Sequence, residues 1–152
     1  MKTINCWFRA YEISHQHPAN CAIHFFAVPA IVLSTLGLLW SLPFPISAHP
    51  LINWASILVC GALIFAFKLS WRLTLGLTIA VSIILMLLWW LSTITSQLAL
   101  LMGVIFIVAW ICQFFGHHIE GKRPSLFNDL QFFIIGPMWI IAKLYQKANI
   151  PW

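Results

Sequence analysis

Apolar residues run along this chain in long blocks that short polar turns separate. Two stretches contain no Asp, Glu, Lys or Arg at all, residues 13–67 and 73–119, which are 55 and 47 residues long. As helix, each stretch would extend over about 70 Å or more, roughly two crossings of a ~30 Å hydrocarbon core. The pattern therefore predicts a polytopic membrane protein with about four transmembrane helices.

Prolines and polar turns divide the apolar blocks into elements. The predicted spans are a helix that begins at Pro18 and continues through the apolar run 25–42, and the segments 51–67, 73–91 and 98–115. Residues 2–16 are typical of an amphipathic helix on a membrane surface. The last apolar run, 132–145, is too short to cross easily and contains Gly136-Pro137, which favours a re-entrant or interfacial helix. We expect an all-α bundle that forms a single integral membrane domain over residues 1–152.

Composition excludes the other broad classes. Hydrophobic residues make up 62% of the chain and charged residues 7%, whereas a soluble domain has about a quarter charged residues and disorder needs low hydrophobicity. The basic residues behind the net charge of +5 form no face suited to nucleic acid, and we expect no nucleic-acid partner.

The positions of the basic residues indicate the orientation in the membrane. If the N-terminus is cytoplasmic, the basic residues of the loops share the cytoplasmic side, and the opposite loops 43–50 and 92–97 contain no Lys or Arg. By the positive-inside rule we therefore expect the N-terminus and the basic loops to lie on the cytoplasmic side of the membrane.

Histidines and one carboxylate gather at the predicted cytoplasmic face, where the first span begins and the fourth ends. These residues are His15, His17, His24, His117, His118 and Glu120. Helical spacing places several polar side chains in three short stripes. The stripes are Tyr11 with His15, Asn20 with His24, and Gln113 with His117 and Glu120.

Three polar stripes at one depth can converge on a single point. Histidine with a carboxylate suits a first-row divalent metal, and such a set with open positions suits non-haem Fe(II). A histidine at a membrane interface also commonly forms only a hydrogen bond with a neighbouring residue. The residues alone leave open this alternative to a metal site. Two further alternatives are a haem-binding electron-transfer protein with histidines as axial ligands, and a small transporter or scaffold without chemistry.

Two longer motifs carry a resemblance to a known family. They are Tyr11-x3-His15-x4-Asn20-x3-His24-x4-Pro29 and Trp110-x2-Gln113-Phe114-x-Gly116-His117-x2-Glu120-x3-Pro124-x-Leu126. The chain resembles the membrane-embedded 2-hydroxy fatty acid dioxygenases, which carry out fatty-acid α-oxidation. The resemblance covers most of the chain, although an acidic residue is expected near the position of Lys143.

The resemblance implies an Fe(II) site whose ligands, and catalytic residues, are His15, His24, His117 and Glu120. His118 and His17 are second choices for the ligand set. The residues that would orient the ligand imidazoles are Tyr11, Asn20 and Gln113. The alternative is that these three residues only form hydrogen bonds between helices. Lys122 and Arg123 would attract the substrate carboxylate or serve only as topology charges.

The reaction implied is oxidative cleavage of a long-chain 2-hydroxy fatty acid with O2. The carboxylate and the neighbouring hydroxyl can together chelate Fe(II), and cleavage between C1 and C2 gives a fatty acid one carbon shorter. The lipid bilayer would hold the acyl tail while the head group reaches an interfacial metal.

Overall fold

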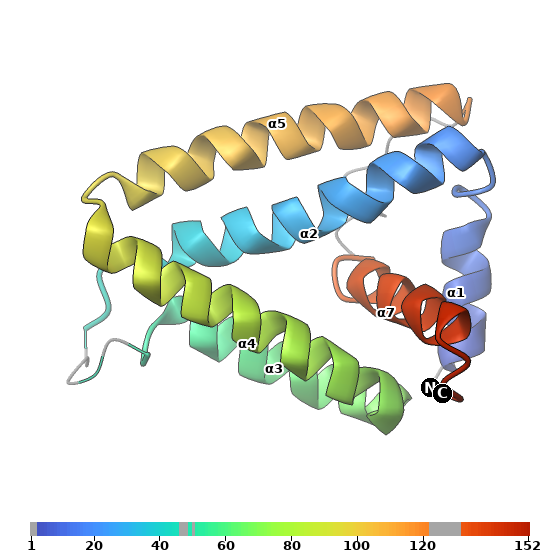
Figure 1. Ribbon diagram of the computed structural model, residues 1–152, viewed down its shortest axis with the longest axis horizontal. Helices are drawn as coiled ribbons and strands as arrows, with labels where there is room; N and C mark the ends of the chain where they lie inside the picture. The colour runs from blue at the N-terminus through green and yellow to red at the C-terminus, as the bar shows by residue number, and fades with distance from the viewer. Residues whose placement is uncertain (1–2, 46–48, 50, 122–131) are drawn as a thin grey trace.

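The computed structural model describes residues 3–45, 49, 51–121 and 132–152. Every regular element in these ranges is a helix, which confirms the all-α prediction (Figure 1). The helices are α1 Ile4–Glu12, α2 Pro18–Trp40, α3 Trp54–Leu69, α4 Trp71–Ile94, α5 Leu98–Ile119 and α7 Ile135–Lys147.

The four long helices form two antiparallel pairs, α2 with α5 and α3 with α4. The pairs approach each other at the end where α4 leads into α5 and diverge toward the other end, where α1 and α7 lie (Figure 1). Helix α7 packs against α4, α1 and α2, so it fills the space between the diverging pairs. We call the end that holds α1 and α7 the open end.

Three helices, α2, α4 and α5, are long and apolar enough to cross a membrane. Helix α3 is apolar but has only 16 residues, or a length of about 24 Å. It begins later than the predicted segment 51–67. The reason is a cap: the Asn53 side chain accepts a hydrogen bond from the Ser56 N–H at 3.1 Å, so the helix begins only at Trp54. Large apolar side chains such as Phe26 and Met86 face outward, as a lipid environment allows.

Helix α7 matches the prediction of an element that does not cross the membrane. It has 13 residues, or about 20 Å. Gly136 and Pro137 do not interrupt the helix but lie in its first turn, where the missing N–H of proline costs no intrahelical bond. The helix is held to α1 at Glu12, whose Oε1 lies 3.1 Å from Trp139 Nε1 and 3.2 Å from Lys143 Nζ.

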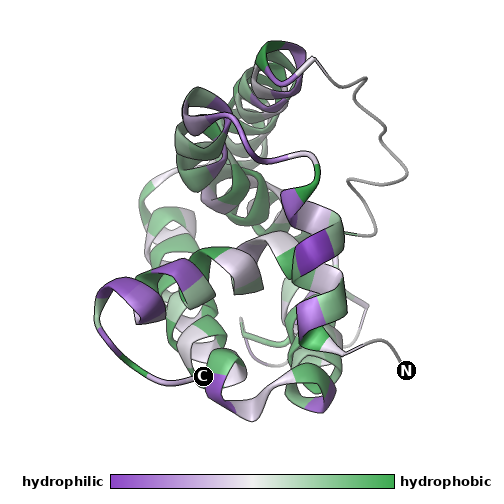
Figure 2. Ribbon diagram, turned by 90° about the vertical axis from the view of Figure 1, so that its right-hand side faces the viewer, coloured by the Kyte–Doolittle hydropathy of each residue, from purple (hydrophilic) through white to green (hydrophobic). Residues whose placement is uncertain are grey.

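Polar residues concentrate at the open end. Figure 2 looks onto it and shows hydrophilic ribbon on α1, on the turn into α2 and on α7, in front of long helices that are mostly hydrophobic. The basic residues Arg9, Lys68, Arg72, Lys143 and Lys147 belong to segments that lie there. This agrees with the predicted one-sided distribution of charge; Lys122 and Arg123 lie outside the described residues.

The predicted amphipathic helix is shorter than expected. It spans Ile4–Glu12 rather than residues 2–16, and it buries Phe8 and Tyr11. Residues 13–17 form the turn that leads into α2, where Pro18 occupies the first helical position and His17 Nδ1 accepts from the Ala19 N–H. Ending α1 early lets this turn carry His15 toward the core.

Candidate metal centre

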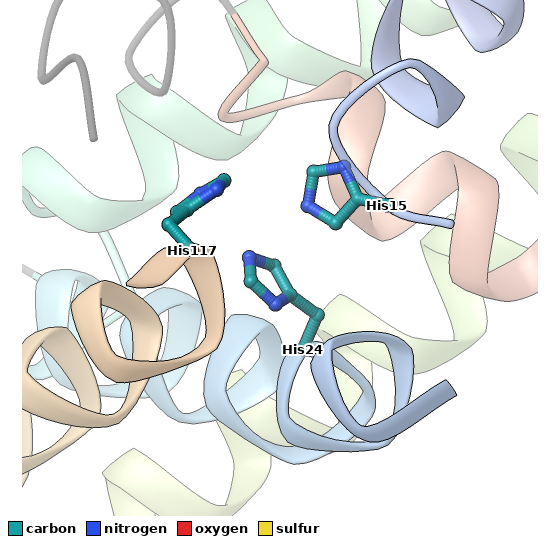
Figure 3. A group of neighbouring side chains, drawn as sticks. All are labelled: His15, His24 and His117. Carbon is teal, nitrogen blue, oxygen red and sulfur yellow. The ribbon is translucent and has the colours of Figure 1, made fainter. Parts of the chain in front are cut away.

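Three histidines from separate parts of the chain meet at the open end. His15 comes from the turn after α1, His24 from the N-terminal part of α2 and His117 from the last turn of α5 (Figure 3). Each offers one ring nitrogen, and these three atoms lie within 4.8 Å of one another. All three side chains are buried, at 6%, 0% and 4% exposure.

The rings stand edge to face rather than stacked. Ring centroids are 4.3 Å apart for His15 and His24, 4.9 Å for His24 and His117, and 5.3 Å for His15 and His117. The interplanar angles lie between 70° and 84°. Figure 3 shows the three imidazoles facing a common space, an arrangement that can hold one ion with modest closure, since a metal–nitrogen bond is about 2.0–2.1 Å.

Backbone carbonyls fix two of these rings. His15 Nδ1 lies 2.7 Å from the carbonyl oxygen of Tyr11, and His24 Nδ1 lies 3.0 Å from that of Asn20. A carbonyl only accepts, so each Nδ1 donates its hydrogen and the lone pair of the neutral ring resides on Nε2. Metal-binding histidines are commonly held through their other nitrogen in this way, and the residues present therefore fit a metal ion.

Aromatic packing holds His15 against α7. The Tyr11 ring stacks on His15 at a centroid distance of 3.9 Å and an angle of 12°. Trp139 from α7 lies 5.4 Å from Tyr11 and 6.3 Å from His15. A Cβ at Gly136 would lie 3.4 Å from the Tyr11 hydroxyl, in ordinary van der Waals contact, so the first turn of α7 packs directly beside the stacked pair.

Gly116 brings α5 against α2 at the level of the histidines. A Cβ there would collide with Asn20 Oδ1 and would lie 3.2 Å from His24 Cε1. The residue next to it is His117, so the absence of a side chain at position 116 is what sets the separation of His24 and His117.

Glu120 stands apart from the three-histidine group, although the sequence resemblance placed it among the ligands. Its two oxygens accept from the N–H groups of Gln16 and His17 and from Asn20 Nδ2, each at 2.9 Å. Burial by itself would raise the pKa of this carboxyl, but those hydrogen bonds and the nearby His15 hold the pKa at about 2. In this structure Glu120 fastens the turn before α2 to the end of α5, and its assignment as a ligand stays a prediction.

The other predicted site residues take different positions. His17 and His118 are exposed and do not belong to the group. Asn20 is buried and holds His24 through its backbone carbonyl, while its amide donates to Glu120 and to the Ser14 carbonyl. Gln113 is buried one turn before His117.

Two residues near the site were not predicted from the sequence. Trp139 and Glu12 form the hydrogen bond that ties α7 to α1 beside the stacked Tyr11 and His15. No spacing signal links positions 12 and 139, because the pairing depends on how α7 folds back.

Two comparisons with known proteins found matches to the chain. A family model described as 2-hydroxy-palmitic acid dioxygenase Mpo1-like matches residues 1–148. A relative in Saccharomyces cerevisiae, the 2-hydroxy-palmitic acid dioxygenase MPO1, is 29% identical over 144 residues, which cover 91% of this chain and 78% of the relative. No solved structure matches the chain. The matched region includes every helix and all three histidines described above.

Proposed function

The chain belongs to the Mpo1-like family, and from that premise we propose that it is an Fe(II)-dependent dioxygenase of long-chain 2-hydroxy fatty acids. It would convert the substrate with O2 into a fatty acid one carbon shorter, with cleavage between C1 and C2. The observation that carries the proposal is the buried group His15, His24 and His117.

These three histidines would hold the metal and leave further coordination positions open. A bound Fe(II) would supply the redox chemistry that lets O2 react next to the substrate carboxyl group. The protein contributes fixed imidazoles: the carbonyls of Tyr11 and Asn20 orient two of the rings before any ion binds, so little order must be created on binding.

The surrounding residues would keep bulk water from the site and hold its geometry. Trp139 and Tyr11 cover His15 from the side of α7. Glu120 joins the turn that carries His15 to α5, which carries His117. We therefore interpret Glu120 as a residue that positions His15 relative to His117.

The position of the site suits an amphiphilic substrate. The histidines lie at the open end, where polar ribbon begins, while the long helices expose apolar side chains (Figure 2). A long acyl tail can stay in hydrocarbon at a gain of about 0.8 kcal/mol per buried CH2, and the head group can reach the interface. We propose that this end faces the cytoplasm, in a bacterial inner membrane or in the endoplasmic reticulum of a eukaryote, as the positions of the basic residues favour.

The decisive experiment follows O2 consumption and products in detergent-purified protein loaded with Fe(II). We expect 2-hydroxypalmitate to be consumed with O2 and to yield the acid one carbon shorter by mass spectrometry, whereas palmitate and lactate give little turnover. His24→Ala should lose both iron and activity, and His118→Ala, an exposed neighbour of the site, should keep both. Equal turnover of palmitate and 2-hydroxypalmitate, or an intense Soret band in the purified protein, would contradict the proposal.

A further inference from the structure

A small cavity lies beside Tyr11, whose ring stacks on His15. It has a volume of about 30 Å³, and its lining includes Tyr11, Val28, Val32, Trp110 and Gln113. By comparison, one water molecule needs about 10–15 Å³ measured in this way. The cavity can therefore receive a hydroxyl-sized group without a large rearrangement.

Two polar atoms of this lining have no hydrogen-bond partner among the described residues. They are the Gln113 side-chain oxygen Oε1 and the Trp110 ring nitrogen Nε1, and both atoms are buried. Gln113 as a whole is 6% exposed. Buried polar groups nearly always have a partner, so a buried acceptor and a buried donor that line one cavity indicate a ligand group.

Trp110 and Gln113 lie three positions apart on one face of α5, and His117 follows on the same face. Gln113 precedes His117 by one turn of the helix. Tyr11 also lines the cavity, and its ring stacks on His15 at a centroid distance of 3.9 Å. A group that occupies the cavity would therefore contact residues that directly flank His15 and His117.

A second, apolar cavity lies beside the first. Val28 and Val32 line both this cavity and a larger one of about 240 Å³ between α2, α4 and α7. The larger cavity has almost entirely apolar walls, among them Pro137, Ile140 and Leu144. Only the side chains of the two valines are common to both linings, so a small shift of these side chains would let a molecule with a polar group against Gln113 place its hydrocarbon chain in the apolar cavity.

We propose, resting on the function proposed above, that Gln113 and Trp110 select the 2-hydroxyl group of the substrate. The hydroxyl oxygen accepts a hydrogen bond from Trp110 Nε1–H, and the hydroxyl hydrogen is donated to Gln113 Oε1. A hydroxyl satisfies both atoms at once. A plain fatty acid has no such group at C2, and its carboxylate has no hydrogen to donate to Gln113.

The test measures binding rather than turnover. The full chain is loaded with Fe(II), kept without O2 in mixed micelles, and titrated calorimetrically with 2-hydroxypalmitate and with palmitate; the measurement is repeated on metal-free protein. We expect 2-hydroxypalmitate to bind at least tenfold more tightly with or without metal, since a site built for a hydroxyl strongly rejects the analogue that lacks it. Palmitate affinity serves as the internal reference for partitioning into the micelle.

Substitutions then assign the preference to the two residues. Gln113→Met keeps the shape of the side chain and removes its acceptor, and should bring the ratio of the two dissociation constants close to one by weakening only the hydroxylated lipid. Trp110→Phe should reduce the ratio partly. Thr35→Val is the matched control, because Thr35 Oγ1 is also buried without a partner among the described residues but does not line this cavity; it should leave the ratio unchanged.

The outcomes separate this inference from the proposed function. Equal binding of the two lipids by the metal-free wild type, or an unchanged preference in Gln113→Met, would overturn the hydroxyl-selective site even if 2-hydroxypalmitate is turned over. A preference that disappears in Gln113→Met supports the site even if the wild type consumes no O2, a result that would instead refute the proposed function. Helical content and thermal unfolding of each variant show that it is folded.

Discussion

The two helix pairs of this protein use their buried positions differently. The α2–α5 pair buries four polar side chains at the open end: Asn20, His24, Gln113 and His117. His24 and His117 belong to the three-histidine group, and Asn20 holds His24 and Glu120 by hydrogen bonds. In the α3–α4 pair, the buried polar side chains among the described residues serve their own helices. Thr74 donates to the Ser70 carbonyl and Asn53 caps α3.

The difference shows how burial should be interpreted in a membrane protein. In the most apolar 18-residue stretch of α4, only 17% of the residues are buried within the protein, whereas in that of α2 39% are buried. Both helices are nevertheless strongly apolar. Lipid solvates apolar side chains, so hydrophobicity alone does not decide which residues face inward. A buried histidine is costly at membrane depth and usually marks function. Among the described residues the buried histidines gather at the open end, together with the amides of Asn20 and Gln113, whereas the buried amide of Asn53 only caps α3.

The largest expected effect concerns the histidines themselves. His15→Ala, His24→Ala and His117→Ala should each reduce iron affinity by at least about 100-fold, because removing a ligand should cost at least as much as removing one of the groups that orient it. Thr74→Val in the other pair should leave iron occupancy unchanged. Metal analysis of the purified variants decides the matter, and full iron occupancy in any two of the histidine variants would show that the ligand set is wrong.

The close approach of α5 to α2 should produce the next largest effect. Gly116→Ala places a methyl group against Asn20 and His24, and we expect about 1–3 kcal/mol of destabilisation together with weaker iron binding. Gly61→Ala in α3 is the matched control, since nothing lies within 4 Å of its added Cβ. It should be neutral or raise stability by up to about 1 kcal/mol. Thermal unfolding in detergent compares the two, and equal melting temperatures would argue against close packing at Gly116.

Glu120→Gln should have the smallest effect, and that effect should depend on pH. The folded-state pKa of about 2 lies below the ordinary value of 4.5, so the charged carboxylate stabilises the fold above pH 4.5 and loses this contribution as the pH falls toward 2. At neutral pH the variant should be less stable by about 1 kcal/mol, since the amide has only one acceptor oxygen, its NH2 group cannot accept from the remaining N–H donors, and solvent screens part of the loss.

The check is the difference in melting temperature between wild type and Glu120→Gln across that range. It should shrink between pH 4.5 and pH 2, whereas a constant difference would contradict the assigned role. Iron content at neutral pH gives a second readout: retention of iron by the variant supports a positioning role, and complete loss supports the ligand role that the resemblance implied.

Much of the site could be predicted because helical spacing fixes face and depth. His24 and His117 stand at the ends of two apolar runs, so any membrane bundle that places both ends on one side brings them to the same level. His15 was predicted from its spacing to Tyr11, and the hydrogen bond to the Tyr11 carbonyl forms even though α1 ends at Glu12. The grouping of the three did not require the exact helix bounds.

Other features depend on contacts that no periodicity contains. Glu120 lies on the predicted stripe, but its partners are backbone N–H groups of Gln16 and His17, which become available only because α1 ends early. The contact of Trp139 with Glu12 depends on where α7 packs. Spacing gives the direction of a side chain within its own helix, whereas the identity of its partner depends on how separate segments pack together.

The distribution of the three histidines along the chain has a consequence for biosynthesis. His15 and His24 leave the ribosome early, and His117 follows more than ninety residues later, a delay of roughly 5–20 s at common synthesis rates. The trio is complete only after α5 has been made and has packed against α2. Under the proposed function, loading with metal would be a late step of membrane assembly, and occupancy of the site would report that the first and last long helices have packed together.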